Sequence, residues 1–275
     1  MKNNPKLLIT LLIIAMLLFI TFNINPFLGI MLILLFVLYK LYTSRSFIYA
    51  LIGNGHFSKG NKEEALHWFK RASSLKSSSP RVITSYAYLL LKEKEIEKPK
   101  EILEALMDKK GMNLQETSQL KMTLALVYWK EGNIDKAVKT LEDVFQEFKN
   151  STLYESLGYL LIVQGDLEKA LSFNREALEY NENSSIIKDN LAQTYYHRNE
   201  LHKAEEIYSK LIPESPTFAE PYYYYGLILK EKGEEDEALK MLKTAASFKE
   251  SFLTDLTKEE IQNQIDILEE SKAVV

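Results

Sequence analysis

The sequence contains no cysteine, and its first 45 residues contain no acidic side chain. A chain without cysteine forms no disulfide scaffold, thiol nucleophile or thiolate-bound metal site, and it suits a reducing compartment. Residues 1–45 hold four of the 34 basic residues, so the remaining chain combines 30 basic with 38 acidic residues. Because a nucleic-acid interface needs a basic face that neutralises phosphates, this acidic body argues against nucleic-acid binding.

Charge is also absent from the whole stretch between Lys6 and Lys40. One helix over this stretch would be roughly 50 Å long, whereas the hydrocarbon core of a bilayer is ~30 Å thick. The sequence Asn-Ile-Asn-Pro at residues 23–26 interrupts the apolar run, and proline favours a turn there. The sequence therefore predicts a transmembrane helical hairpin within residues 1–45, with helices at about residues 6–23 and 26–43.

A cleaved signal peptide is the competing interpretation of this N-terminal segment. It is disfavoured because no small-x-small cleavage pattern lies near Phe22–Pro26 and a second apolar run follows at once. Basic residues flank both outer ends of the hairpin, so the positive-inside rule places both ends, and the chain after Arg45, in the cytoplasm. No glycine or proline lies between Met31 and Ile52. We therefore expect the second membrane helix to continue nearly unbroken into the next helix.

The rest of the chain repeats one pattern. Small residues recur at separations of 34, 38, 33, 34 and 34 residues, at Gly53, Ala87, Ala125, Gly158, Ala192 and Gly226. A second marker follows each of these by twelve residues, at Ala65, Pro99, Ala137, Ala170, Ala204 and Ala238. A small residue allows two helices to approach closely, while large apolar residues at helical spacing fill the interfaces between them. The pattern predicts an array of helix pairs.

This pattern resembles the tetratricopeptide repeat (TPR), a 34-residue helix–turn–helix motif, over roughly residues 46–252. The matching fragments include "LGYLLIVQGDLEKALSFNREALEYN" and "YYGLILKEKGEEDEALKMLKTA". The resemblance implies an all-α fold in which an α-solenoid of about six repeats follows the hairpin and is stabilised by contacts between neighbours. We place the repeats at about residues 46–79, 80–113, 118–150, 151–184, 185–218 and 219–252.

Two segments depart from a uniform array. Four extra residues before the third repeat fall within Met107–Thr117, and we expect them to lengthen a loop. Residues 253–275 should form a capping helix and tail, because Leu256–Ala273 is amphipathic. Thr257 and Glu260 have the spacing of a capping box at the start of this helix. Such a terminal helix gives the array a polar outer face.

The sequence offers little evidence of catalytic chemistry. The four histidines lack the spacing of a helical zinc pair. Gly53-Asn54-Gly55 has neither a strand before it nor the Gly-Lys-Ser/Thr of a phosphate loop after it. Acidic pairs such as Glu205-Glu206 lie early in second helices, where they favour the positive helix end. We therefore expect no enzyme, no catalytic residue, no metal site and no cofactor.

The TPR resemblance implies that the first helices of successive repeats line a concave groove. The inward positions give the following partner-binding candidates: Tyr88, Met122, Leu126, Trp129, Lys130, Tyr159, Ile162, Tyr196, Tyr223 and Lys230. Exposed aromatic side chains gathered on one face usually bind a partner. On this interpretation a partner segment crosses the aromatics, and the two lysines meet its acidic groups. The alternative is that the aromatics pack between repeats as core.

The function that fits these features is a membrane-anchored TPR scaffold or adaptor, most simply in a bacterial cytoplasmic membrane. It would bind a protein or peptide partner in the groove and the lipid bilayer through residues 1–45. Two alternatives stay open, namely an extracytoplasmic envelope-assembly factor and an intracellular peptide sensor. The sequence identifies neither the partner nor the oligomeric state.

Overall fold

The computed structural model describes residues 16, 17 and 19–273. Helices joined by short loops make up this part of the chain, and these residues contain no strand. The chain divides into two compact units, one ending at Ile83 and the other beginning at Thr84. The predicted first membrane helix falls largely on residues 1–15, which lie outside the described residues.

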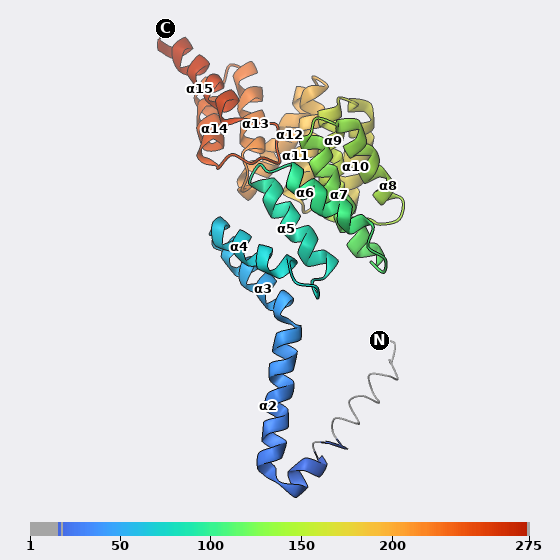
Figure 1. Ribbon diagram of the computed structural model, residues 1–275. Coiled ribbons are helices and arrows are strands. Elements are labelled where there is room, and N and C mark those ends of the chain that lie inside the picture. The colour runs from blue at the N-terminus through green and yellow to red at the C-terminus, as the bar shows by residue number, and fades with distance from the viewer. Residues whose placement is uncertain (1–15, 18, 274–275) are drawn as a thin grey trace. The chain divides into compact units, whose positions relative to one another are not determined.

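The helices follow one another in the order shown in Figure 1. The first three labelled helices are α2 (Pro26–Thr43), α3 (Arg45–Ser58) and α4 (Lys62–Ser73). They are followed by α5 (Pro80–Lys92), α6 (Glu97–Met107), α7 (Leu114–Lys130), α8 (Ile134–Phe145), α9 (Ser151–Gln164), α10 (Leu167–Tyr180), α11 (Ser185–His197) and α12 (Leu201–Leu211). The short 3-10 helix η1 (Ile212–Glu214) precedes α13 (Glu220–Glu231), α14 (Glu235–Ser247) and α15 (Lys258–Ala273).

The start of α2 coincides with the predicted break in the apolar segment. Asn25 is extended, and its side-chain oxygen accepts a hydrogen bond from the backbone N–H of Phe27 at 2.9 Å. Pro26 occupies the first turn, where amide groups have no intrahelical partner and proline is tolerated. Phe22 packs against Gly29, since a Cβ added to Gly29 would lie 2.7 Å from the phenyl ring. Residues on the two sides of Asn25 are therefore in contact.

The junction after α2 is short. Ser44 alone separates α2 from α3, and its N–H donates to the carbonyl of Lys40 at 2.9 Å. This arrangement is close to the nearly unbroken helix that the absence of glycine and proline predicts. Next, α3 packs on α4, where Gly53 lies against the ring of Phe69.

Small residues bring the two helices of a pair close together. A Cβ added to Gly158 in α9 would lie 2.0 Å from Oδ1 of Asn174 in α10. A Cβ added to Gly226 in α13 would lie 2.9 Å from the side chain of Leu242 in α14. The alanines of the second marker are fully buried: Ala65, Ala137, Ala170, Ala204 and Ala238. Close packing of the two helices of a pair therefore explains the repeated small residues.

Replacing Gly158 by alanine is expected to lower the free energy of unfolding by about 1–3 kcal/mol, because the new methyl group displaces buried atoms. Those atoms belong to Asn174, whose side-chain amide donates to the Gly158 carbonyl at 3.3 Å and to the Thr194 hydroxyl at 3.1 Å. Urea unfolding followed by circular dichroism measures the effect. The control is Gly55→Ala, which meets no atom within 4 Å and should stabilise α3 by roughly 0.5–1 kcal/mol. Unchanged stability of Gly158→Ala would contradict the close approach of α9 and α10.

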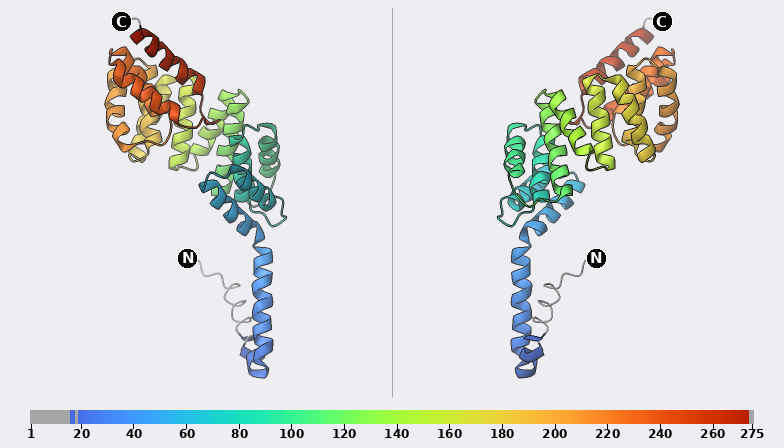
Figure 2. Two further views of the ribbon diagram at one scale, coloured as in Figure 1. Left: turned by 90° about the vertical axis from the view of Figure 1, so that its left-hand side faces the viewer. Right: turned by 90° about the vertical axis from the view of Figure 1, so that its right-hand side faces the viewer.

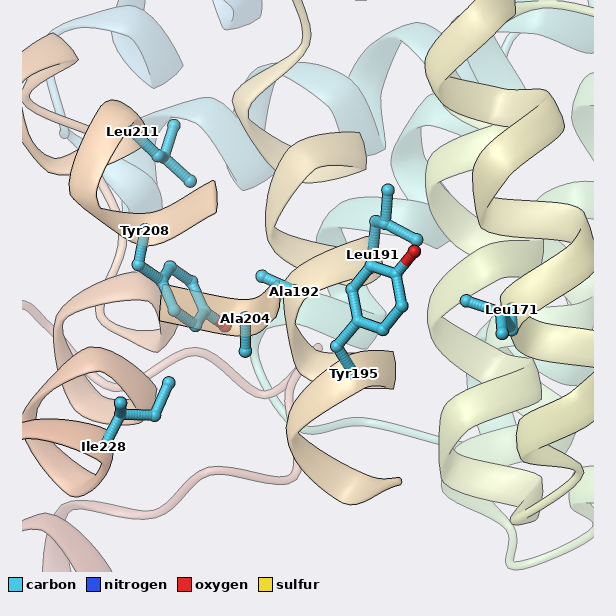
Figure 3. Close-up of a cluster of buried hydrophobic side chains, with 8 residues drawn as sticks. All are labelled: Leu171, Leu191, Ala192, Tyr195, Ala204, Tyr208, Leu211 and Ile228. Atoms are coloured by element: carbon cyan, nitrogen blue, oxygen red, sulfur yellow. The ribbon is translucent and has the colours of Figure 1, made fainter. Parts of the chain in front are cut away.

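Successive helix pairs share their buried side chains. Four consecutive helices, α10 to α13, contribute to one cluster: Leu171, Leu191, Ala192, Tyr195, Ala204, Tyr208, Leu211 and Ile228 (Figure 3). Tyr208 is fully buried in this cluster, and its hydroxyl donates to Asp189 Oδ1 at 3.1 Å. Because the cluster contains residues from neighbouring pairs, each pair depends on the next for burial of its apolar face.

The expectation of a longer loop before the third predicted repeat is wrong. The additional residues instead form the first turn of α7, which begins at Leu114 and has 17 residues. Asn113 fixes this start: its side chain accepts from the N–H of Glu116 at 2.9 Å, and the Glu116 carboxylate accepts from the N–H of Asn113 at 3.2 Å. This capping box satisfies first-turn amides that would otherwise lack partners.

The segment expected to form a capping helix contains helix α15 (Lys258–Ala273). Helix α15 packs on α14, and it buries Ile261, Ile265 and Leu268. Thr257 and Glu260 form the expected capping box, with the N–H of Thr257 donating to Glu260 Oε2 at 2.7 Å and the N–H of Glu260 donating to Thr257 Oγ1 at 3.1 Å. One face of α15 thus covers the last pair, while the exposed residues of the helix are mostly polar, with Ile267 as an exposed apolar residue.

Candidate functional site

A hollow of about 520 Å³ lies among the first helices of successive pairs in the second unit. Helices α5, α7, α9 and α11 contribute its walls, together with the start of α13 and the loop between α14 and α15. The hollow brings together half of the ten residues predicted to bind a partner: Tyr88, Met122, Leu126, Trp129 and Tyr159. Met122, Leu126 and Trp129 all belong to α7, whereas Tyr88 on α5 and Tyr159 on α9 reach the same hollow through the stacking of the helix pairs.

The apolar wall of the hollow is tightly packed on α7 and α9. Trp129 is 6% exposed and Met122 is 3% exposed. The rings of Trp129 and Tyr159 meet edge to face, with centroids 5.5 Å apart, a favoured arrangement for aromatic pairs. Leu126 and Tyr159 remain half-buried. The wall therefore combines buried rings, which hold its shape, with side chains that a partner can still touch.

Residues 250–255 of the loop between α14 and α15, here called the crossing segment, lie against this wall. The backbone N–H of Asp255 donates to the hydroxyl of Tyr159 at 2.9 Å, and the Lys130 ammonium donates to the carbonyl of Thr254 at 3.0 Å. At the start of the crossing segment, Glu250 forms an ion pair with Lys94 at 3.8 Å. Figure 2 shows this loop reaching from the red end of the array back toward the green helices. The crossing segment thus forms one rim of the hollow.

The two predicted groove lysines are bonded within the chain. The Lys130 ammonium pairs with Asp255 at 3.3 Å and lies 3.6 Å from the centroid of the Trp129 ring. Burial lowers the pKa of Lys130, while the Asp255 carboxylate opposes that shift. Lys230 donates to the side-chain oxygen of Gln264 in α15 at 2.8 Å. Both lysines therefore contact the C-terminal part of the chain, and a contact of either lysine with acidic groups on a partner stays a prediction.

The remaining predicted residues lie outside the lining of this hollow. Ile162 is 8% exposed and belongs to the buried part of α9. Tyr196 and Tyr223 both pack against Tyr224, with ring centroids 5.1 Å and 5.3 Å apart. Tyr196 thus contacts the neighbouring helix α13, whereas Tyr223 contacts the next residue of its own helix and also packs against the buried cluster formed by α13, α14 and α15.

Three acidic side chains also line the hollow, and the aromatic pattern did not select them. They are Glu155 on α9, Asp189 on α11 and Glu220 at the start of α13. Asp189 is 2% exposed, and its carboxylate accepts hydrogen bonds from Gln193 at 2.7 Å and from Tyr208 at 3.1 Å. Burial raises the pKa of Asp189, and the nearby carboxylate of Glu220 raises it further.

The spacing of the repeats predicts that two of these acids face the groove. Glu155 follows Met122 by 33 residues, and Asp189 follows Glu155 by 34 residues, so all three occupy equivalent positions of successive repeats. The predicted groove residues include Met122 at this position but neither of the two acids. A search for acidic residues at the same inward position would have found the other two.

Comparison with known proteins supports the repeat interpretation. Residues 56–185, just under half of the chain, match the family model of the SusR N-terminal TPR domain. The fold is similar to that of a chain in the crystal structure of the APC/C hetero-tetramer Cut9–Hcn1, with a TM-score of 0.65, 12% identity and coverage of 93% of this chain and 45% of that chain. The array is a TPR-like solenoid.

Two further proteins are similar to this chain. The structure of PilF from Pseudomonas aeruginosa has a TM-score of 0.57 and 17% identity, covering 80% of this chain and 97% of that chain. The BBSome complex member BBS4 of Bos taurus is 23% identical over 188 residues, or 68% of this chain and 36% of that protein. The chain thus spans about a third of the length of BBS4. At these identities the solved structures establish the fold alone.

Proposed function

We propose that this protein is a membrane-anchored TPR scaffold that binds a protein or peptide partner in the hollow on its second unit. The observation that carries this proposal is the hollow itself, an apolar wall with half-buried Tyr88, Leu126 and Tyr159 facing a space of about 520 Å³. Binding pockets for small groups typically have volumes of about 300–1,000 Å³ and mostly apolar walls. TPR arrays generally act as interaction scaffolds, which favours binding over catalysis.

The anchoring part of the proposal rests on α2. In the described part of the chain, this is the one helix whose length and composition suit a membrane span. Its 18 residues contain one charged side chain, Lys40, and bury only Gly29. At 1.5 Å per residue α2 measures roughly 27 Å, close to the thickness of the hydrocarbon core. Basic residues flank the apolar N-terminal segment at both of its outer ends, and by the positive-inside rule this favours a cytoplasmic array.

The full chain is expected to stay in the membrane fraction after an alkaline wash and to keep its array in the cytoplasm. Protease added to intact spheroplasts should leave residues 46–275 uncut, whereas the same protease should degrade them after the membrane is permeabilised. Immunoblotting against a tag after Val275 reads the result. Cleavage in intact spheroplasts would reverse the topology and favour the envelope-assembly alternative. Release by the alkaline wash would contradict anchoring.

Site-specific crosslinking tests the hollow as the binding surface. A photo-crosslinking amino acid at Ile186, which lines the hollow and is 42% exposed, should capture a discrete partner in cells. The control position is Lys240, an exposed residue of α14 outside the hollow. Mass spectrometry identifies any product. A product formed from Lys240 and not from Ile186 would place the binding surface elsewhere.

A further inference from the structure

The charges around the hollow are one-sided. Glu155, Asp189 and Glu220 line it, and no lysine, arginine or histidine does. Acids elsewhere on the array often have basic partners, as Glu214 has in Lys188 at 2.7 Å. Among the described residues, the ion pairs involve none of the three hollow carboxylates. The hollow therefore presents acidic groups without a counter-ion from the chain.

The crossing segment also neutralises a lysine beside the hollow. Lys130 is the lysine that adjoins the Trp129–Tyr159 wall, and Asp255 of the crossing segment is paired with it at 3.3 Å. An acidic partner would have to displace this pair to reach the ammonium group. A basic partner instead meets carboxylates that have no counter-ion from the chain. Charge complementarity thus favours a cationic occupant.

The apolar part of the hollow suits the stem of a long basic side chain. Lysine and arginine bury their methylene groups against apolar surface while the charged end seeks polar partners. Leu126, Tyr88 and Phe218 supply apolar and aromatic surface in the same hollow. Aromatic rings add a favourable interaction with a nearby cation. One basic side chain with apolar neighbours would therefore match both parts of the lining.

We infer that the hollow binds an extended peptide segment in which a lysine or arginine lies between apolar residues. The basic group would lie among Glu155, Asp189 and Glu220, and the apolar neighbours would lie on the α5–α7–α9 wall. This inference rests on the proposed function and specifies the chemistry of its partner.

Asp189 is the best-positioned anchor for the basic group. Its two oxygens are held by Gln193 and Tyr208, so the carboxylate is fixed in place before any partner arrives. A preorganised group loses little conformational entropy on binding. The same carboxylate lacks a positive neighbour, and both burial and Glu220 raise its pKa. A bound cation would offset both effects.

The test uses the full chain in detergent micelles and nine-residue peptide pools that are randomised except at the central position. That position is fixed as lysine, arginine, glutamine or glutamate, and binding is measured by fluorescence anisotropy. The lysine and arginine pools should bind at least tenfold more tightly than the glutamate pool. Asp189→Asn and Glu220→Gln should each reduce this preference by about tenfold, as expected for loss of one partner of a desolvated charge pair. Glu182→Gln, an exposed change of the same charge outside the hollow, should keep it.

Three outcomes would overturn the inference. Equal or tighter binding of the glutamine or glutamate pool would leave the hollow as a peptide site but reject a basic partner. An unchanged preference in both Asp189→Asn and Glu220→Gln would reject the role of the hollow in that preference. Absence of binding by every pool at millimolar concentration would reject both this inference and the proposed function.

Discussion

Replacing Trp129 by alanine is expected to lower the free energy of unfolding by about 3–5 kcal/mol, the range for removing a large buried aromatic side chain. Trp129 is 6% exposed, meets Tyr159 edge to face, and lies under the Lys130 ammonium group. Its loss leaves a cavity in the wall and removes the surface on which Lys130 is held. Urea unfolding of the full chain in detergent, followed by circular dichroism, measures the effect.

Trp68→Ala provides the control for this experiment. Trp68, the other tryptophan of the chain, is half-buried on α4, so its replacement should destabilise the protein much less. If Trp129→Ala were as stable as the unmodified chain, the packing of the α7–α9 wall would be contradicted. The expected result also assigns Trp129 chiefly to the inter-repeat core, so binding studies should use side chains that remain accessible.

Replacing Asp189 by asparagine is expected to raise the free energy of unfolding at neutral pH by roughly 1–3 kcal/mol, because a buried carboxylate without a counter-ion is replaced by a neutral group of the same shape. Asparagine can still accept the hydrogen bond from Tyr208. Stability would then rise while affinity for a basic peptide falls, a combination that a merely damaged fold cannot produce.

The increase in the free energy of unfolding caused by Asp189→Asn should itself grow as the pH rises. Burial, with a contribution from Glu220, raises the pKa of Asp189 in the folded state, so the folded chain binds a proton more tightly than the unfolded chain. Stability of the unmodified protein therefore falls as pH rises from the unfolded pKa toward the raised folded pKa. Asp189→Asn removes this fall. The difference between the two proteins should be small near pH 4 and should grow until the carboxylate ionises in the folded state.

Thermal unfolding of both proteins across this pH range checks the prediction. Gln193 and Tyr208 contact the carboxylate directly, and Glu220 acts on it through charge. Glu182→Gln is the matched control and should show no such pH-dependent gain, because Glu182 is exposed. A loss of stability in Asp189→Asn at neutral pH would mean that the ionised carboxylate is itself stabilising in the folded array.

The local features of the fold could be read from the sequence because their causes are local. The turn at Asn25-Pro26, the spacing of small residues such as Gly158, and the capping box of Thr257 and Glu260 each depend on a few neighbouring side chains. The start of α7 also has a local cause, the cap at Asn113, but the expectation of a longer loop did not take this cap into account. The candidate site was predictable only in part, since register identifies inward positions but not the exposure of their side chains.

The sequence by itself determined an all-helical array of paired helices, an apolar N-terminal segment and a capped C-terminal helix, because helix periodicity and close packing act between near neighbours. Only the tertiary structure decided that Asp255 meets Tyr159 and Lys130, and that Glu155, Asp189 and Glu220 share one hollow. These groups are separated by tens of residues along the chain. Whether they meet depends on the summed rotations between stacked helix pairs and on the path of one loop, and no local pattern encodes either quantity.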